Sequence, residues 1–76
     1  MTAYKVNNRF YFSLNDAIEY AKEVIRNRYY IPSQCNENWK ITKGKKGGYC
    51  VAVLDEWSKV GNIHLLQESI RTIEIL

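Results

Sequence analysis

A single amphipathic helix over Ser13–Arg28 constrains this chain more than any other segment. Apolar side chains recur there at helical spacing and form one stripe: Leu14, Ala17, Ile18, Ala21, Val24 and Ile25. Polar and charged residues fill the opposite side. Ser13 is a good N-cap, because its hydroxyl can accept a hydrogen bond from the amide of Asp16. The strands predicted on either side of the helix need an apolar surface to cover, and this helix supplies it.

A β-hairpin is predicted over residues 3–12, just before the helix. Asparagine tolerates the positive φ that a tight hairpin turn requires, so Asn7 and Asn8 can form a two-residue turn. This turn places Tyr4 opposite Tyr11. We expect one face of the hairpin to lie under the helix, and its residues are Ala3, Lys5, Phe10 and Phe12. The face directed away from the helix then carries Tyr4, Val6 and Tyr11.

A second hairpin is predicted over residues 39–54, around a loop rich in glycine and lysine. A five-residue loop over Gly44–Gly48 gathers the larger side chains on one face: Trp39, Ile41, Tyr49, Val51 and Val53. A loop shortened by one residue would instead join Trp39 and Ile41 to Cys50, Ala52 and Leu54. We favour the five-residue loop because it places the larger side chains over the helix. The second strand is apolar on both faces, which predicts an interior strand.

The C-terminal segment has the least regular pattern. Helical spacing of apolar residues predicts a short helix over 63–69, and the alternation of Ile73 with Ile75 predicts a terminal strand over 71–75. The expected fold is α+β, in the order β-β-α-β-β followed by that short helix and strand. One long amphipathic helix packs on one face of a small antiparallel sheet of four to five strands, and residues 1–76 form a single domain.

Size and composition favour a small folded protein without a membrane span. The chain has 76 residues, of which 46% are hydrophobic, and it carries a net charge of +3. No apolar run approaches the roughly 20 residues that a transmembrane helix needs. The N-terminus has no signal-peptide pattern. We interpret Cys35 and Cys50 as free thiols in a reducing compartment, which predicts a cytoplasmic protein.

The sequence contains no evident constellation of catalytic or metal-ligating residues. His64 is the only histidine, and no Cys, His or acidic residue lies near it at a metal-ligand spacing. The loop rich in glycine and lysine lacks the spacing of a Walker A motif. We therefore expect a protein that is not an enzyme and that holds neither a metal nor a cofactor.

The basic loop of the second hairpin is a candidate contact for nucleic acid. Lysines at the tip of a hairpin can neutralise phosphates, and an aromatic ring at its base can stack on a nucleobase. The residues of this candidate site are Lys40, Lys43, Lys45, Lys46 and Tyr49. A solvated hairpin tip without a function is the simpler alternative.

Aromatic side chains are more numerous than so thin a core requires. Tyr and Trp are enriched among interface anchors, which makes these residues candidates for protein binding: Tyr4, Tyr11, Tyr29, Tyr30 and Trp57. The first hypothesis is a small non-enzymatic protein-binding module, such as an inhibitor or adaptor of the phage or mobile-element type that acts on a host protein. A homodimer is one version of it. The alternative is a nucleic-acid-binding module that uses the lysine-rich hairpin at 40–49.

Overall fold

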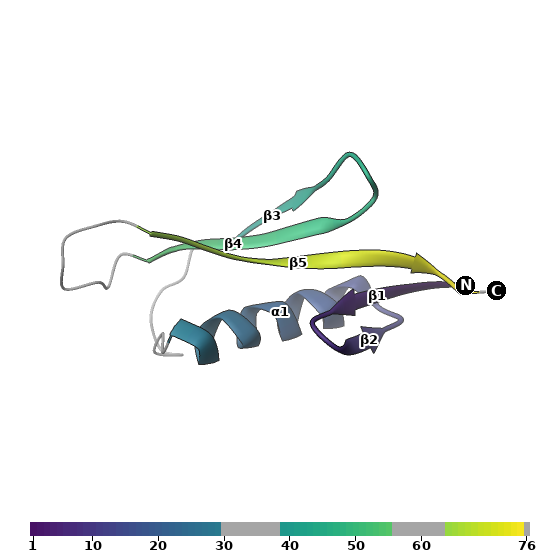
Figure 1. Ribbon diagram of the computed structural model, residues 1–76, viewed down its shortest axis with the longest axis horizontal. Helices are drawn as coiled ribbons and strands as arrows, with labels where there is room; N and C mark the ends of the chain where they lie inside the picture. Colours follow the sequence, from purple (N-terminus) through teal and green to yellow (C-terminus); the bar gives the residue numbers. More distant parts are fainter. Residues whose placement is uncertain (30–38, 56–63, 76) are drawn as a thin grey trace.

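The chain folds into one helix and a five-stranded antiparallel sheet in the part that the structure describes. This computed structural model describes residues 1–29, 39–55 and 64–75. The elements are β1 (Thr2–Val6), β2 (Arg9–Tyr11), α1 (Leu14–Tyr29), β3 (Lys40–Lys43), β4 (Tyr49–Asp55) and β5 (His64–Glu74). The strand order is β2-β1-β5-β4-β3 (Figure 1). The last strand of the chain therefore lies at the centre, beside the first.

The helix α1 forms where the apolar stripe predicts it and packs on one face of the sheet. The Asp16 amide donates a long hydrogen bond of 3.5 Å to the Ser13 hydroxyl, which caps the first turn. Ala17, Ala21 and Ile25 are fully buried along the stripe. The helix packs against β1, β2, β4 and β5, while β3 extends beyond it (Figure 1). An α+β fold with the helix on one face of the sheet agrees with the sequence prediction.

Both hairpins have the predicted registers. Tyr4 pairs with Tyr11 across a turn in which Asn7 has a φ of 57°, in the left-handed region that asparagine tolerates. Lys43 pairs with Tyr49 across the loop Gly44–Gly48, which is the longer of the two loops considered. Each register is set by a short turn between strands that are adjacent in the chain, so the local sequence is sufficient to predict it.

The first hairpin turns the opposite face toward α1 from the one expected. Tyr4 and Tyr11 pack against the core and Val6 is fully buried, whereas Phe10 and Phe12 are 56% and 67% exposed. The reason is strand order: β1 lies next to the central strand and β2 lies at the edge. Burial of the first hairpin is therefore determined by the side chains of β1. The larger apolar side chains of β1, Tyr4 and Val6, lie on the face that is turned toward α1.

The C-terminal segment is one continuous strand, so the predicted helix over 63–69 is wrong. β5 pairs with β4 over residues 64–70 and with β1 over residues 71–74. Leu66 and Ile70 are buried. Their spacing fits one face of a strand as well as one face of a helix, so it does not distinguish the two.

An inward-facing glutamate interrupts the apolar alternation of β5. Glu68 lies between Leu66 and Ile70 on the helix-facing side, and its side chain is 16% exposed. Nη2 of Arg28, near the end of α1, lies 3.2 Å from Oε2 of Glu68. Within the described residues, Oε2 of Glu68 has no hydrogen bond of normal geometry. The cost of burying its negative charge is therefore offset by the positive charge of Arg28. The pair connects the end of the helix to the central strand.

Several predictions concern residues outside the described part of the chain. They concern Cys35, Tyr30 and Trp57. Cys50 on β4 is a free thiol. In the described residues, no helix has the length and apolar character needed to cross a membrane.

Candidate functional site

The sheet has one face under α1 and one open face. Side chains alternate between the two faces along each strand, and the buried Leu66 and Ile70 of β5 mark the face under α1. The alternate residues of β5, together with the residues paired with them, form the open face. Its exposed large apolar residues are Phe10, Leu54 and Leu65.

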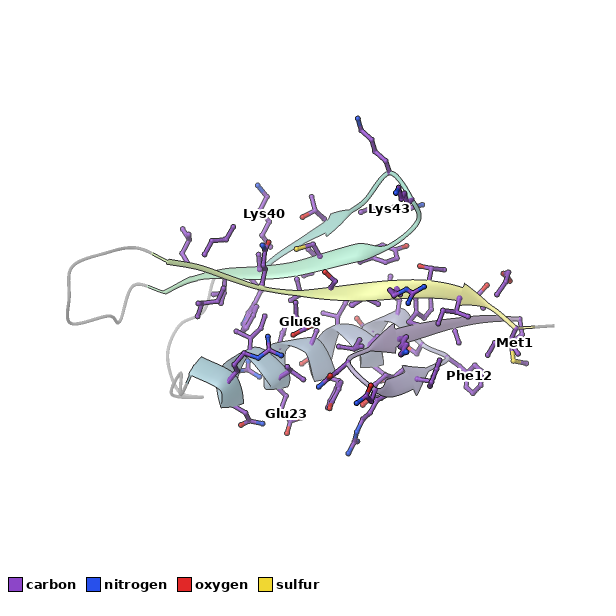
Figure 2. All side chains as sticks on the ribbon, in the orientation of Figure 1. Met1, Phe12, Glu23, Lys40, Lys43 and Glu68 are labelled. Atoms are coloured by element: carbon purple, nitrogen blue, oxygen red, sulfur yellow. The ribbon has the colours of Figure 1, made fainter. Side chains whose placement is uncertain are left out.

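Charge divides between the two faces. On the open face, the charged residues that the structure describes are all basic: Lys5 on β1, Lys40 on β3 and Arg71 on β5. Among residues 1–28, 39–54 and 65–75, the acidic side chains lie on α1 or on the helix-facing side of the sheet, and they are Asp16, Glu19, Glu23, Glu68 and Glu74. Figure 2 shows Glu23 and Lys40 at opposite edges of the molecule. The open face therefore suits an anionic partner.

A row of side chains across the strands concentrates this positive charge. Lys5 pairs directly with Phe10 on β2 and with Arg71 on β5, and Lys5 Nζ lies 5.6 Å from the centre of the Phe10 ring. Lys46, in the loop between β3 and β4, lines a hollow of about 340 Å³ together with Gly48, Arg71 and Thr72. We call Phe10, Lys5, Arg71 and Lys46 the basic row.

The loop that carries Lys46 is held close to β5. The Thr72 hydroxyl donates a hydrogen bond to the Gly47 carbonyl, and Gly47 has a φ of 84°. A Cβ atom at Gly48 would lie 2.9 Å from the carbonyl oxygen of Ile70, so only glycine lets the loop approach this closely. These contacts bring Lys46 beside Arg71.

The Lys5–Arg71 pair in the basic row is expected to lower the stability of the fold. Like charges directly opposite each other on neighbouring strands repel, and Lys5 and Arg71 have this arrangement. Lys5 is half-buried, which reduces screening by salt. No acidic side chain described on the open face compensates the pair. A bound anion would relieve this repulsion.

An apolar hollow occupies the other end of the open face. It has a volume of about 410 Å³ and is lined by Trp39, Lys40, Ala52, Val53, Leu54 and Leu65. Leu54 and Leu65 pair directly and are 47% and 59% exposed. The open face therefore has the basic row at one end and a mainly apolar hollow, with Lys40 in its lining, at the other.

A further hollow of about 440 Å³ lies on the helix side of the molecule, between α1 and β2. It is lined by Arg9, Tyr11, Asp16, Glu19, Tyr20, Glu23 and Arg26. A side-chain hydrogen bond with Tyr11 raises the pKa of Arg9, whose guanidinium carbon lies 5.1 Å from the centre of the Tyr20 ring. Three acidic and two basic side chains line this hollow, so its charges are mixed.

The structure separates the predicted nucleic-acid residues. Lys40 faces the open side, whereas Lys43 and Tyr49 face the helix side. Figure 2 shows Lys43 near the tip of the second hairpin, apart from Lys40. Lys45 and Lys46 are exposed in the loop. Lys40 and Lys46 are the predicted residues that contribute to the open face or its rim.

The predicted protein-binding tyrosines of the first hairpin contact other aromatic rings on the helix side. The rings of Tyr4 and Tyr49 meet edge to face at 6.3 Å, and those of Tyr11 and Tyr20 lie 5.5 Å apart. Tyr4 and Tyr11 are half-buried. Tyr29 is the last residue of α1. These contacts give Tyr4 and Tyr11 a packing role in the protein itself.

Sequence reasoning did not select Lys5, Phe10 and Arg71 as site residues. Lys5 and Arg71 lie near opposite ends of the chain, and only the pairing of β1 with β5 brings them together. One usable signal was that every second residue from Leu65 to Ile73 is free of acidic side chains. These residues are Leu65, Gln67, Ser69, Arg71 and Ile73.

Comparisons with known proteins identify no relative of this chain. No protein-family model, no curated protein and no solved structure matches it. Within the described residues, no group of three or more His, Cys, Asp or Glu side chains could hold a metal ion. The open face is therefore the basis for a functional proposal.

Proposed function

We propose that this protein is a non-enzymatic module that binds single-stranded nucleic acid across the open face of its sheet. The observation that carries the proposal is the basic row, in which Lys5 lies directly opposite Arg71 and Lys46 lies beside Arg71. Phosphates bound along these cations would relieve their repulsion. Phe10, at the end of the row, is 56% exposed and offers its ring to a nucleobase.

Single strands fit this face better than duplexes do. A base can stack on Phe10 only when its own face is uncovered, and in a duplex the neighbouring bases cover it. The row consists of cations and an aromatic ring, which contact phosphates and base faces rather than base edges. Binding should therefore tolerate many sequences.

Replacing Arg71 by glutamate should weaken binding and stabilise the fold. The change removes a charged contact worth about 1.5–3 kcal/mol, so affinity should fall on the order of tenfold or more. The same change turns a repulsive cross-strand pair with Lys5 into an attractive one, which should add about 0.2–1 kcal/mol to the free energy of unfolding. Fluorescence anisotropy with a labelled single-stranded oligonucleotide measures the first effect, and urea denaturation measures the second.

Lys43→Glu is the matched control, because it makes the same charge change on the helix-facing side of β3. It should weaken binding far less than Arg71→Glu does. The wild-type protein should show a slope of log affinity against log salt of about −2, the value for three phosphates on a single strand. Equal losses for the two variants would assign binding to net charge alone. A wild-type protein that fails to bind at micromolar concentration and low salt would overturn the proposal.

Phe10→Ala should weaken single-strand binding through the loss of stacking. Alanine substitution of a stacking aromatic costs about 1–3 kcal/mol per base, and the loss should be confined to single strands. Phe12→Ala is the control, because Phe12 is 67% exposed but follows the end of β2 and is not in the basic row. The same anisotropy titration with single-stranded and duplex probes makes the comparison. If Phe10→Ala binds both probes as tightly as the wild type, Phe10 is not a stacking platform.

Binding of a protein partner is the second candidate function, and the apolar hollow favours it. Leu54 and Leu65 expose a directly paired apolar surface that binding of phosphates would not use. Exposed apolar surfaces of this kind are typical of contacts with other proteins. The first-hairpin tyrosines, by contrast, are half-buried in the protein itself.

A further inference from the structure

We infer that the uncovered edge of β5 accepts an extended segment of a partner protein as an added strand. β5 pairs with β4 over residues 64–70, but with β1 only over residues 71–74. Figure 1 shows β1 running beside only one half of β5. Among the described residues, no strand pairs with the β1-side edge of Leu65–Ser69.

The hydrogen bonds at the chain ends identify the backbone groups on that edge. The Ile75 amide donates to the Met1 carbonyl at 2.7 Å, and the Met1 amino group donates to the Ile75 carbonyl at 3.1 Å. Backbone groups alternate between the two edges of a strand, so every second residue back from Ile75 points toward the β1 side. Leu65, Gln67 and Ser69 therefore direct their N–H and C=O groups to the uncovered edge. The Ile70 carbonyl lies near Gly48, on the β4 side, as this alternation requires.

This edge lacks the short length and the outward charges that protect the other edges of the sheet, and the inward-facing Glu68 within it is paired with Arg28. The edge strand β3 has four residues and begins and ends with lysine, and the edge strand β2 has three residues and begins with Arg9. Short strands and edge charges oppose strand addition. The uncovered part of β5 presents Leu65, Gln67 and Ser69, none of which is charged. An extended segment that continues the line of β1 would satisfy its backbone groups.

Side chains near this edge indicate the chemistry of the added strand. Leu65 is 59% exposed on the open face, so an apolar side chain opposite it would be covered by a cross-strand contact. Lys40 and Arg71 lie on the same acid-free face, which favours acidic side chains in the segment. The predicted occupant is therefore a segment of another protein that contains both apolar and acidic residues. A second copy of this chain would bring the same cations to that face and would be repelled.

Hydrogen exchange of the isolated protein tests whether the edge is uncovered. The amides of Leu65, Gln67 and Ser69 should exchange quickly, whereas those of Leu66, Glu68 and Ile70 should be protected by the ladder with β4. NMR measures each amide separately. Equal protection of the two sets would mean that the edge is already covered, and it would overturn the inference.

Gln67→Pro with a defined peptide tests strand addition itself. The probe is a short synthetic peptide in which every second residue is threonine and the residues between are alternately valine and glutamate, so that apolar and acidic side chains share the face of Leu65, Lys40 and Arg71. Proline at this position removes an N–H from the uncovered edge and leaves the β4 ladder intact, so the variant should fold. The peptide should slow exchange at Leu65, Gln67 and Ser69 in the wild type, and Gln67→Pro should bind it on the order of tenfold more weakly. Gln67→Ala keeps the N–H and should bind as the wild type does.

N-methylated peptides keep the test decisive should Gln67→Pro fail to fold. Two versions of the probe carry methyl groups either on the valine and glutamate nitrogens or on the threonine nitrogens. Only one set of nitrogens can face β5, so only one version should lose binding to the wild-type protein. Equal binding of both versions, or no change in any amide at millimolar peptide, would overturn strand addition. A homodimer in sedimentation that Gln67→Pro dissociates would assign the edge to a second copy instead and overturn the proposed partner.

Discussion

Replacing Ile25 by alanine is expected to lower the free energy of unfolding by about 2–5 kcal/mol. Ile25 is fully buried at the centre of the helix stripe and packs in one cluster with Val51, Leu66 and Ile70. Truncation removes apolar surface from the core and leaves a cavity between α1 and the central strands. Small domains have about 5–15 kcal/mol of stability in total, so a large part of it depends on this one side chain. Thermal and urea denaturation followed by circular dichroism measure the loss.

Ile41→Ala is the matched control for Ile25→Ala. Ile41 lies on the same side of the sheet, but it belongs to the edge strand β3 and is 42% exposed. Its truncation should change stability much less, within about 1 kcal/mol. A wild-type midpoint for Ile25→Ala would show that α1 does not cover the core.

Replacing Arg28 by alanine should destabilise the protein, whereas replacing Glu68 by leucine should not. Without Arg28, the buried Oε2 of Glu68 loses the cation that lies 3.2 Å away. An uncompensated buried polar group costs about 1–3 kcal/mol, and we expect the lower part of that range because Arg28 is 49% exposed and water can partly replace it. Glu68→Leu removes the buried charge and extends the apolar face formed by Leu66 and Ile70, a change that is often neutral or stabilising.

The Arg28→Ala, Glu68→Leu double variant completes this test. With Glu68 gone, the loss of Arg28 should cost little more than the packing of its side-chain stem. Urea denaturation of the wild type, both single variants and the double variant gives the coupling energy. A coupling energy near zero would contradict the position of Glu68 on the helix-facing side of β5.

The sequence by itself determined the local elements of this protein. The stripe of α1 and the Ser13 cap depend on residues within one or two helical turns of each other. The turn at Asn7 and the loop Gly44–Gly48 define the hairpin registers because each joins strands that are adjacent in the chain. These features follow from residue types at short separations, and therefore the sequence is sufficient to predict them.

Only the tertiary structure decided the strand conformation of residues 64–70 and the orientation of the first hairpin, whereas the alternation of Ile73 with Ile75 already predicted a strand at the end of the chain. The separation of Leu66 and Ile70 suits a helix and a strand equally. Glu68 breaks the apolar alternation between them, and its ion-pair partner Arg28 is far away in the sequence, so the pattern does not indicate that position 68 faces inward. The pairing of β5 with β4 and β1 resolves this ambiguity. The position of β1 beside the central strand likewise selects the face of Tyr4 and Val6 for burial.

The candidate site also depends on tertiary structure. Lys5 and Arg71 become neighbours only when the two ends of the chain pair, and Lys46 joins them because Gly48 allows its loop to approach β5. Among the described residues, Leu65–Ser69 have no partner strand on the β1 side because β1 pairs only with residues 71–74 of β5. Such long-range pairings are selected by the packing of the whole domain, so a pattern of neighbouring residues does not encode them.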